Sequence, residues 1–190
     1  MAAVVWTPER VRVPGDGMFN PDLREPRIGV MVHYDGSSSD HGGLAWFADP
    51  KCEVSYQVGA LDDGRWAQIA PDSARAWHAG ACRTSDPKRL SYRDANSAFY
   101  AIAALTDETH QVTVAQMLTI AWKIRTWFRA EGWKPEETWR IVGHDTEAVF
   151  ERGHARAGQR GRKIDPTGPN PKNPILAIED IRYLVPRLTL

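Results

Sequence analysis

The chain has few cysteines, no long apolar run and no excess of either charge. Its only cysteines, Cys52 and Cys82, lie outside any Cys-x-x-Cys pair, which excludes a scaffold built on disulfides. The two could pair with each other, but we expect reduced thiols. Lys plus Arg equals Asp plus Glu at 24 each, so the formal net charge is zero. This balance argues against a strongly basic surface, and we expect no nucleic-acid partner.

No apolar run approaches the roughly 20 residues that cross a bilayer. Residues 1–17 lack a basic segment followed by a long apolar one, the pattern typical of a signal peptide. We therefore expect synthesis in the cytoplasm without a signal peptide, and no insertion into a membrane.

The composition is that of an ordinary globular protein. With 190 residues, of which 42% are hydrophobic and 25% charged, the chain can form one domain with a substantial core. Eight tryptophans are many for this length. Some belong to the core, and the excess suits a groove that holds sugar or peptide. A monomer is the default expectation.

Apolar runs of strand length predict a sheet. Residues 1–27 contain four prolines and predict an irregular arm with one short strand near Val11–Val13. The remaining predicted strands are Ile28–His33, Val54–Leu61 and Arg65–Ile69 (a hairpin around Asp62-Asp63-Gly64), Phe99–Leu105 and Trp139–Val142. Ala76–Gly80 is expected to be a loop.

Helical periodicity is clearest in Val114–Glu131, where apolar residues recur at three- and four-residue steps. Thr113 and Gln116 fit a capping box, and Gly132 ends the run. A second helix is predicted over Ile175–Val185 after Asn173-Pro174, followed by a short tail. One or two helical turns are predicted over Leu44–Ala48, after a loop over Asp35–Gly43. Together these elements predict a single α/β domain, with a central mixed sheet flanked by helices.

Three residues near predicted strand ends could bind one metal ion. His33 closes an early strand, His144 follows a late strand after Gly143, and Asp165 lies in the loop beyond. Two imidazoles and a carboxylate form a three-ligand zinc set that leaves one position open for water. A single His at a strand end is more often structural, and an Asp before Pro more often forms a turn. The zinc hypothesis therefore depends on the joint layout of the three residues.

Five motifs occur in the order seen in a known enzyme family. They are VHYD at Val32–Asp35, SYQVGALDDG at Ser55–Gly64, AWHAG at Ala76–Gly80, IVGHD at Ile141–Asp145 and GRKIDP at Gly161–Pro166. On these motifs the chain resembles the zinc-dependent N-acetylmuramoyl-L-alanine amidases of type 2. That family includes phage amidases and the peptidoglycan-recognition proteins. The resemblance covers about Ile28 to Pro166, most of the chain.

The resemblance implies a mixed sheet with a zinc-containing groove on one side and roles for seven residues. His33, His144 and Asp165 match the metal ligands. Lys163 matches a lysine that stabilises the tetrahedral oxyanion, and Tyr56 matches a catalytic tyrosine of the phage amidases. His78 matches a position that lines the substrate groove, where Trp77 could stack on sugar. The domain expected from the match is residues 28–190, with residues 1–27 as its arm.

Two departures from the family pattern stand out. Many members carry a catalytic Glu in the strand matched by Phe99–Leu105, and the alignment puts Ala103 there. Residues 147–160 look like an insertion between His144 and Asp165. It contains His154, which could replace His144 as a ligand. We prefer His144 because it follows a strand and a glycine, whereas His154 lies in a Gly- and Arg-rich loop.

The resemblance implies zinc-dependent hydrolysis of the amide between N-acetylmuramic acid and L-alanine in peptidoglycan, which lyses the cell wall. We expect a phage endolysin that acts on the wall after release. Cytoplasmic recycling of muropeptides is the alternative location. Two alternative functions stay open, namely a peptidoglycan-binding module without catalysis and a zinc hydrolase of another amide or peptide.

Overall fold

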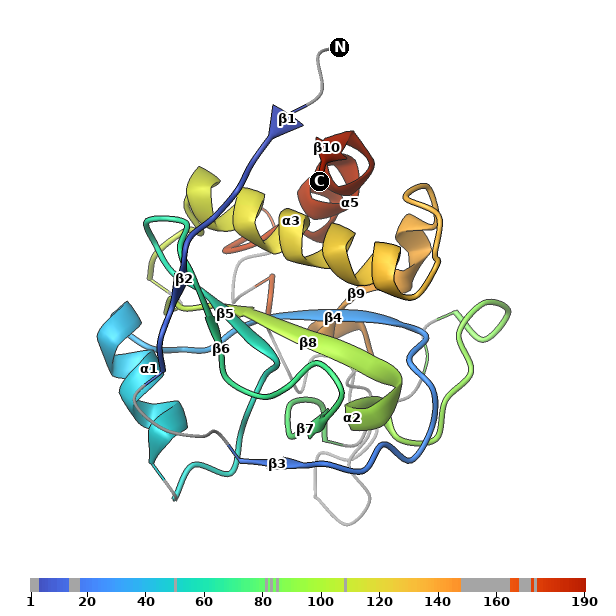
Figure 1. Ribbon diagram of the computed structural model, residues 1–190, viewed down its shortest axis with the longest axis horizontal. Helices are drawn as coiled ribbons and strands as arrows, with labels where there is room; N and C mark the ends of the chain where they lie inside the picture. The colour runs from blue at the N-terminus through green and yellow to red at the C-terminus, as the bar shows by residue number, and fades with distance from the viewer. Residues whose placement is uncertain are drawn as a thin grey trace.

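The computed structural model describes residues 4–13, 18–49, 51–80, 82, 84, 86–107, 109–147, 165–167, 172 and 174–190. Its centre is a six-stranded sheet in the order β2-β6-β5-β8-β4-β9 (Figure 1). The strands are β2 (Arg10–Val11), β6 (Trp66–Gln68), β5 (Val58–Ala60), β8 (Phe99–Ala104), β4 (Gly29–Tyr34) and β9 (Ile141–Gly143). Within this six-stranded sheet, β5 and β6 form the predicted antiparallel hairpin and the other neighbouring strands are parallel. The sheet is therefore mixed. The predicted α/β fold is confirmed.

The two central strands, β4 and β8, are buried along their whole length. Both match the predicted runs, with β4 one residue further along the chain. Side chains alternate between the faces of a strand. Val30, Val32 and Ile102 therefore pack in the main core on one face, whereas Met31 and His33 project from the other.

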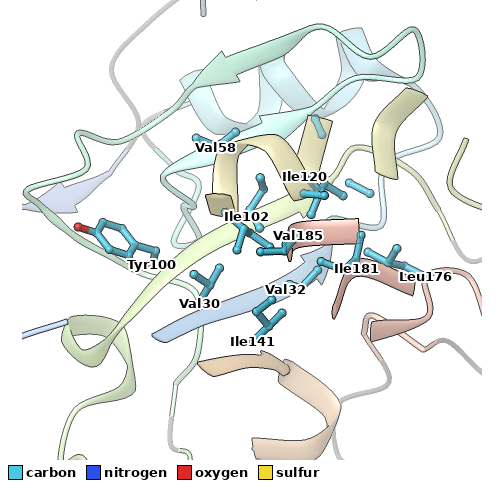
Figure 2. Close-up of a cluster of buried hydrophobic side chains, with 14 of the residues drawn as sticks. Val30, Val32, Val58, Tyr100, Ile102, Ile120, Ile141, Leu176, Ile181 and Val185 are labelled. Carbon is cyan, nitrogen blue, oxygen red and sulfur yellow. The ribbon is translucent and has the colours of Figure 1, made fainter. Parts of the chain in front are cut away.

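Helices α3 (Val114–Ala130) and α5 (Ile178–Leu184) cover the core face of the sheet. Figure 2 shows Ile120, Ile181 and Val185 meeting the strand residues there. The capping box is confirmed, because the Thr113 and Gln116 side chains each accept the other residue's backbone N–H. Gly132 follows the helix with a φ of 70°, a conformation that favours glycine.

The opposite face of the sheet carries shorter elements. In Figure 1, α1 (Asp40–Ala48) and α2 (Ala95–Ala98) lie on the side away from α3 and α5. Helix α1 begins four residues earlier than predicted, because the Ser39 side chain caps it by accepting the Gly42 N–H. The expectation of a loop through Gly43 was therefore wrong.

The C-terminal helix is shorter than predicted. Asn173 lies outside the described residues, and the helix runs only over Ile178–Leu184 instead of Ile175–Val185. A 3₁₀ turn, η2 (Val185–Arg187), and strand β10 (Leu188–Thr189) follow it, where we expected a tail. Strand β10 pairs with β1 (Val4–Val5), and Leu188 is buried.

The N-terminal segment contains three two-residue strands, where one was expected. Strand β2 joins the edge of the main sheet, and β3 (Phe19–Asn20) pairs with β7 (Arg75–Ala76) in the segment expected to be a loop. Residues Thr138–Arg140 form the 3₁₀ turn η1 before β9. The division into an arm of residues 1–27 and a catalytic domain of residues 28–190 stays a prediction. Within the described residues, no helix is long and apolar enough to span a bilayer.

Candidate metal centre

The parallel strands β4 and β9 bring the two histidines together. Val32 pairs with Gly143, so the next residues, His33 and His144, are neighbours at the carboxyl end of the sheet. His144 opens the short helix α4 (His144–Glu147) directly after β9. A Cβ at Gly143 would lie 2.5 Å from an oxygen of the Asp145 carboxylate and 3.0 Å from Cδ of Pro166, so a larger residue would require these side chains to shift. The sequence pattern Gly-His therefore serves close packing at this point.

Asp165 completes the cluster. Its backbone oxygen accepts the Asp145 N–H at 2.7 Å, which ties the returning loop to α4. Its Oδ2 lies 2.7 Å from His33 Nδ1 and 3.1 Å from His144 Nδ1. One ligand atom from each of the three residues lies within 4.8 Å of the others, close enough to hold one metal ion.

The far nitrogens of both imidazoles have partners of their own. His144 Nε2 lies 3.0 Å from the Ala79 carbonyl oxygen. Because a carbonyl only accepts, Nε2 donates to it. The neutral ring then presents the Nδ1 lone pair to a metal ion, whereas a protonated ring donates its Nδ1–H to Asp165. His33 Nε2 lies 3.2 Å from His78 Nδ1. Metal-binding histidines are commonly oriented in this way, with the outer nitrogen held and the inner one free to ligate.

Charge in the cluster fits cation binding. Burial raises the pKa of Asp165, but hydrogen bonds from His144 and His33 outweigh it and hold that pKa well below its usual range. Burial, with His33 and His144 nearby, lowers the pKa of His78 well below its ordinary value. A neutral His78 can accept the His33 N–H. The donor set, two imidazoles and one carboxylate, is one that zinc uses in catalytic sites.

Tyr56 lies against the cluster. Its ring centroid is 4.9 Å from that of His33 and 5.4 Å from that of Phe47. Burial raises the pKa of Tyr56 well above its ordinary value, and the negative charges of Asp165 and Asp35 raise it further. The phenol therefore keeps its proton and remains a hydrogen-bond donor.

A cavity of about 330 Å³ opens beside these residues. Tyr56, His78, His144 and Asp165 line it, together with apolar side chains and Asp35 from the segments around α1 and β5. The mixture of apolar walls and a few convergent polar groups is typical of ligand sites.

Most of the predicted site residues meet here. The structure brings His33, His144, Asp165, Tyr56 and His78 together, and Trp77 lies next to His78 with its side chain 42% exposed. Lys163, His154 and residues 148–160 of the expected insertion lie outside the described residues.

Ala103 is the neighbour of His33 in the sheet. The register pairs the two residues directly, and Ala103 is fully buried in an apolar cluster with Tyr56 and Phe47. A methyl group therefore occupies the position at which the resemblance leads one to expect a Glu. Asp35 and Asp165 are the carboxylates that line the cavity in the described part of the chain.

Sequence reasoning missed Asn96, which supports the site from behind. Its Oδ1 accepts the backbone N–H groups of His78 at 2.9 Å and Ala79 at 2.8 Å. These two residues contact His33 and His144, so Asn96 fixes the partners of both imidazoles. The position before the strand Phe99–Leu105 gave no sequence signal for this role.

A family model described as N-acetylmuramoyl-L-alanine amidase matches residues 24–168. A comparison with curated proteins finds no match. Among solved structures, a selenomethionine derivative of AmpD is similar, with 22% identity over 95% of this chain and 96% of that one and a TM-score of 0.65. Staphylococcus aureus hydrolase AmiA, in complex with its ligand, has 17% identity over 98% and 83% of the two chains and a TM-score of 0.61. Escherichia coli AmiD, in complex with anhydro-N-acetylmuramic acid-L-Ala-D-gamma-Glu-L-Lys, has 23% identity over 75% and 53% and a TM-score of 0.54.

Proposed function

The chain belongs to the type 2 N-acetylmuramoyl-L-alanine amidase family, and we propose that it works as a zinc enzyme whose ligands are His33, His144 and Asp165. The activity is hydrolysis of the amide bond between N-acetylmuramic acid and L-alanine in peptidoglycan. One observation carries the zinc proposal. Both Nδ1 atoms converge on one Asp165 oxygen, while the Nε2 atoms are engaged elsewhere.

The chain's own groups prepare this reaction. Zinc bound at these residues supplies hydroxide near neutral pH and polarises a carbonyl. The Tyr56 hydroxyl donates a hydrogen bond to the carbonyl oxygen of the scissile amide as it gains negative charge. Such a preorganised donor stabilises a transition state by several kcal/mol. Lys163 is proposed for the same role on the strength of the family motif alone.

The substrate is peptidoglycan, and the cavity beside Tyr56 is the proposed site for the muramoyl peptide. AmiD in its complex holds a muramic acid linked to a peptide beginning with L-Ala. We propose that a ligand of this class lies in the cavity here, with His78 and Trp77 at its wall. We further propose a monomer that acts on the cell wall after release, as an endolysin does. Cytoplasmic recycling of muropeptides is the alternative location.

Zinc content and product analysis test the proposal together. Wild type, His144→Ala and the control His110→Ala are compared, because His110 is exposed and remote from the cluster. We expect about one zinc per chain in wild type and control. Mass spectrometry of digested peptidoglycan is expected to find stem peptides that begin with L-Ala. His144→Ala should lose both metal and cleavage.

Other outcomes would assign the chain differently. Metal and activity that survive His144→Ala would transfer the ligand role to another residue such as His154. A wild type with neither metal nor cleavage would be a wall-binding module. Cleavage at a different amide would leave the metal centre intact and change the substrate.

A further inference from the structure

We propose that Arg75 is a positioning residue for the amidase reaction, because it holds the exposed indole of Trp77 as a rigid contact surface for the substrate. This inference rests on the proposed function, since it takes the cavity beside His33 as the substrate site. Arg75 itself is buried and does not line that cavity.

The backbone of Trp77 is fixed next to His78, which lines the cavity. Its carbonyl oxygen accepts the Ser55 N–H and its N–H donates to Ser55 Oγ, both at 2.9 Å. The neighbours of these two residues, Val54, Tyr56 and His78, line the cavity. The Trp77 side chain is nevertheless 42% exposed. A large, partly exposed aromatic ring thus belongs to the residue that precedes His78 of the cavity wall.

The guanidinium of Arg75 holds this ring. Its central carbon lies over the indole, 4.7 Å from the ring centroid, which is the geometry of a cation–π contact. Its Nε donates to Asp94 Oδ2 at 2.6 Å and one Nη donates to Asp94 Oδ1 at 3.2 Å. A two-point bond of this kind fixes the orientation of the guanidinium plane as well as its position.

The Asp94 carboxylate binds Arg75 and does not cap helix α2. It occupies the N-cap position of α2, yet its side chain makes no capping hydrogen bond. Its carboxylate accepts from Arg75 and from Ser97 Oγ. Glu25 from the N-terminal segment accepts the backbone N–H groups of Arg93 and Asp94. The carboxylate that could cap the helix therefore faces Arg75.

The arrangement leaves one polar group of Arg75 unsatisfied within the described part of the chain. The second Nη of Arg75 is buried and has no hydrogen-bond partner among the described residues. A buried unsatisfied donor is unfavourable. Arg75 at the same time lies over the Trp77 ring, which remains partly exposed and can contact a ligand. Immobilising a contact residue before binding lowers the entropy cost of binding, and this gain would appear in KM.

The kinetics of four variants on a soluble muramoyl peptide test the proposal. These are Arg75→Met, Arg75→Lys, Trp77→Ala and the double variant Arg75→Met/Trp77→Ala. Arg75→Met should raise KM about threefold to tenfold with kcat nearly unchanged, the size expected for a lost cation–π contact. Arg75→Lys, which keeps the charge without the two-point bond, should fall between. The double variant should be no worse than Trp77→Ala, since Arg75 acts through that ring.

Controls separate positioning from folding. Arg65→Met breaks another Arg–Asp pair, with Asp63 in the exposed hairpin turn, and should leave KM unchanged. Fluorine NMR of 5-fluorotryptophan-labelled protein, with the Trp77 signal assigned from Trp77→Phe, should record a changed shift and width in Arg75→Met. A normal KM in an active Arg75→Met variant, or additive losses in the double variant, would overturn the role of Arg75. An inactive wild type would instead overturn the proposed function.

Discussion

At the scale of single residues, the methyl group of Ala103, which pairs with His33 in the sheet, is the feature with most consequence for the chemistry. Ala103 fills the neighbouring position in β8 and packs among apolar groups. Tyr56, from the same apolar cluster, lies with its ring centroid 4.9 Å from that of His33, and it is the residue of that cluster that carries a hydroxyl. More of the reaction should therefore depend on its hydroxyl than on any group in β8.

Tyr56→Phe removes that hydroxyl and keeps the ring contacts with His33 and Phe47. We expect kcat to fall about 100-fold, the usual effect of losing one donor to a developing oxyanion. Zinc content and melting temperature should stay close to wild type. Steady-state kinetics on muramoyl peptide with metal analysis would measure both.

Tyr100→Phe is the matched control for this substitution. Tyr100 is another buried tyrosine, with its hydroxyl bonded to Glu131 and its ring stacked on Trp127, away from the cavity. Tyr100→Phe should lower the free energy of unfolding, because the hydrogen bond to Glu131 is lost, and should leave kcat unchanged. If Tyr56→Phe retained full kcat, the tyrosine would be a packing residue.

At the scale of elements, the metal cluster depends on how α2 holds the neighbouring loop. Asn96 in α2 accepts two buried N–H groups, and these belong to residues that contact both imidazoles. The four-residue helix is buried along its whole length, and through Asn96 it holds the residues that contact the two imidazoles. Outer contacts of this kind commonly tune metal affinity.

Asn96→Ala leaves both N–H groups buried without their acceptor. We expect the free energy of unfolding to fall by about 3 kcal/mol, and zinc affinity to fall about 10- to 100-fold. Denaturant unfolding and competition with a chromogenic chelator would measure the two effects. Asn20→Ala is the control, because Asn20 also accepts a backbone N–H, that of Asp22, but at an exposed position. An unchanged zinc affinity in folded Asn96→Ala would limit Asn96 to a structural role.

The elements also explain how far the sequence could predict this molecule. Strands β4 and β8 and helix α3 follow from local pattern, because continuous apolar runs and a capped 3.6-residue period need no distant partner. The two-residue strands β1, β3 and β10 exist only through pairing with remote segments, so no local pattern marks them, whereas β2 overlaps the short strand predicted near Val11–Val13. The predicted start of the C-terminal helix at Ile175 was wrong for a similar reason: Ile175 and Leu176 donate their backbone N–H groups to the remote residues Thr167 and Pro166, and the helix begins at Ile178.

The same distinction holds within the site. The residue types and strand-end positions of His33 and His144 could be predicted, and the structure brings both to Asp165. Asn96 and Arg75 could not be predicted in the same way. Asn96 contacts the backbone of His78 and Ala79, and Arg75 pairs with Asp94, through tertiary contacts that no sequence pattern indicates. Only the folded structure brings these residues into hydrogen-bonding and ring contact.

At the scale of the whole molecule, the proposed zinc ion would join three separate parts of the chain. His33 belongs to the central strand β4, His144 to the start of α4, and Asp165 to the segment that returns to the site. His33 and Asp165 are 132 positions apart in the sequence. A ligand that binds only the assembled site stabilises the native state, because the unfolded chain has no such site to offer.

Removal of zinc should therefore lower the melting temperature of the whole domain. A ligand present at about 1,000 times its dissociation constant stabilises by about 4 kcal/mol, and each kcal/mol shifts the melting point by about 2–4 °C in a chain of this size. We expect a fall of about 10 °C on chelation, reversed by added zinc, in scanning calorimetry. His144→Ala should melt at one temperature with or without chelator. If wild type bound zinc stoichiometrically but melted alike in both conditions, the ion would lie outside the folded core, and the three-residue site would have to be abandoned.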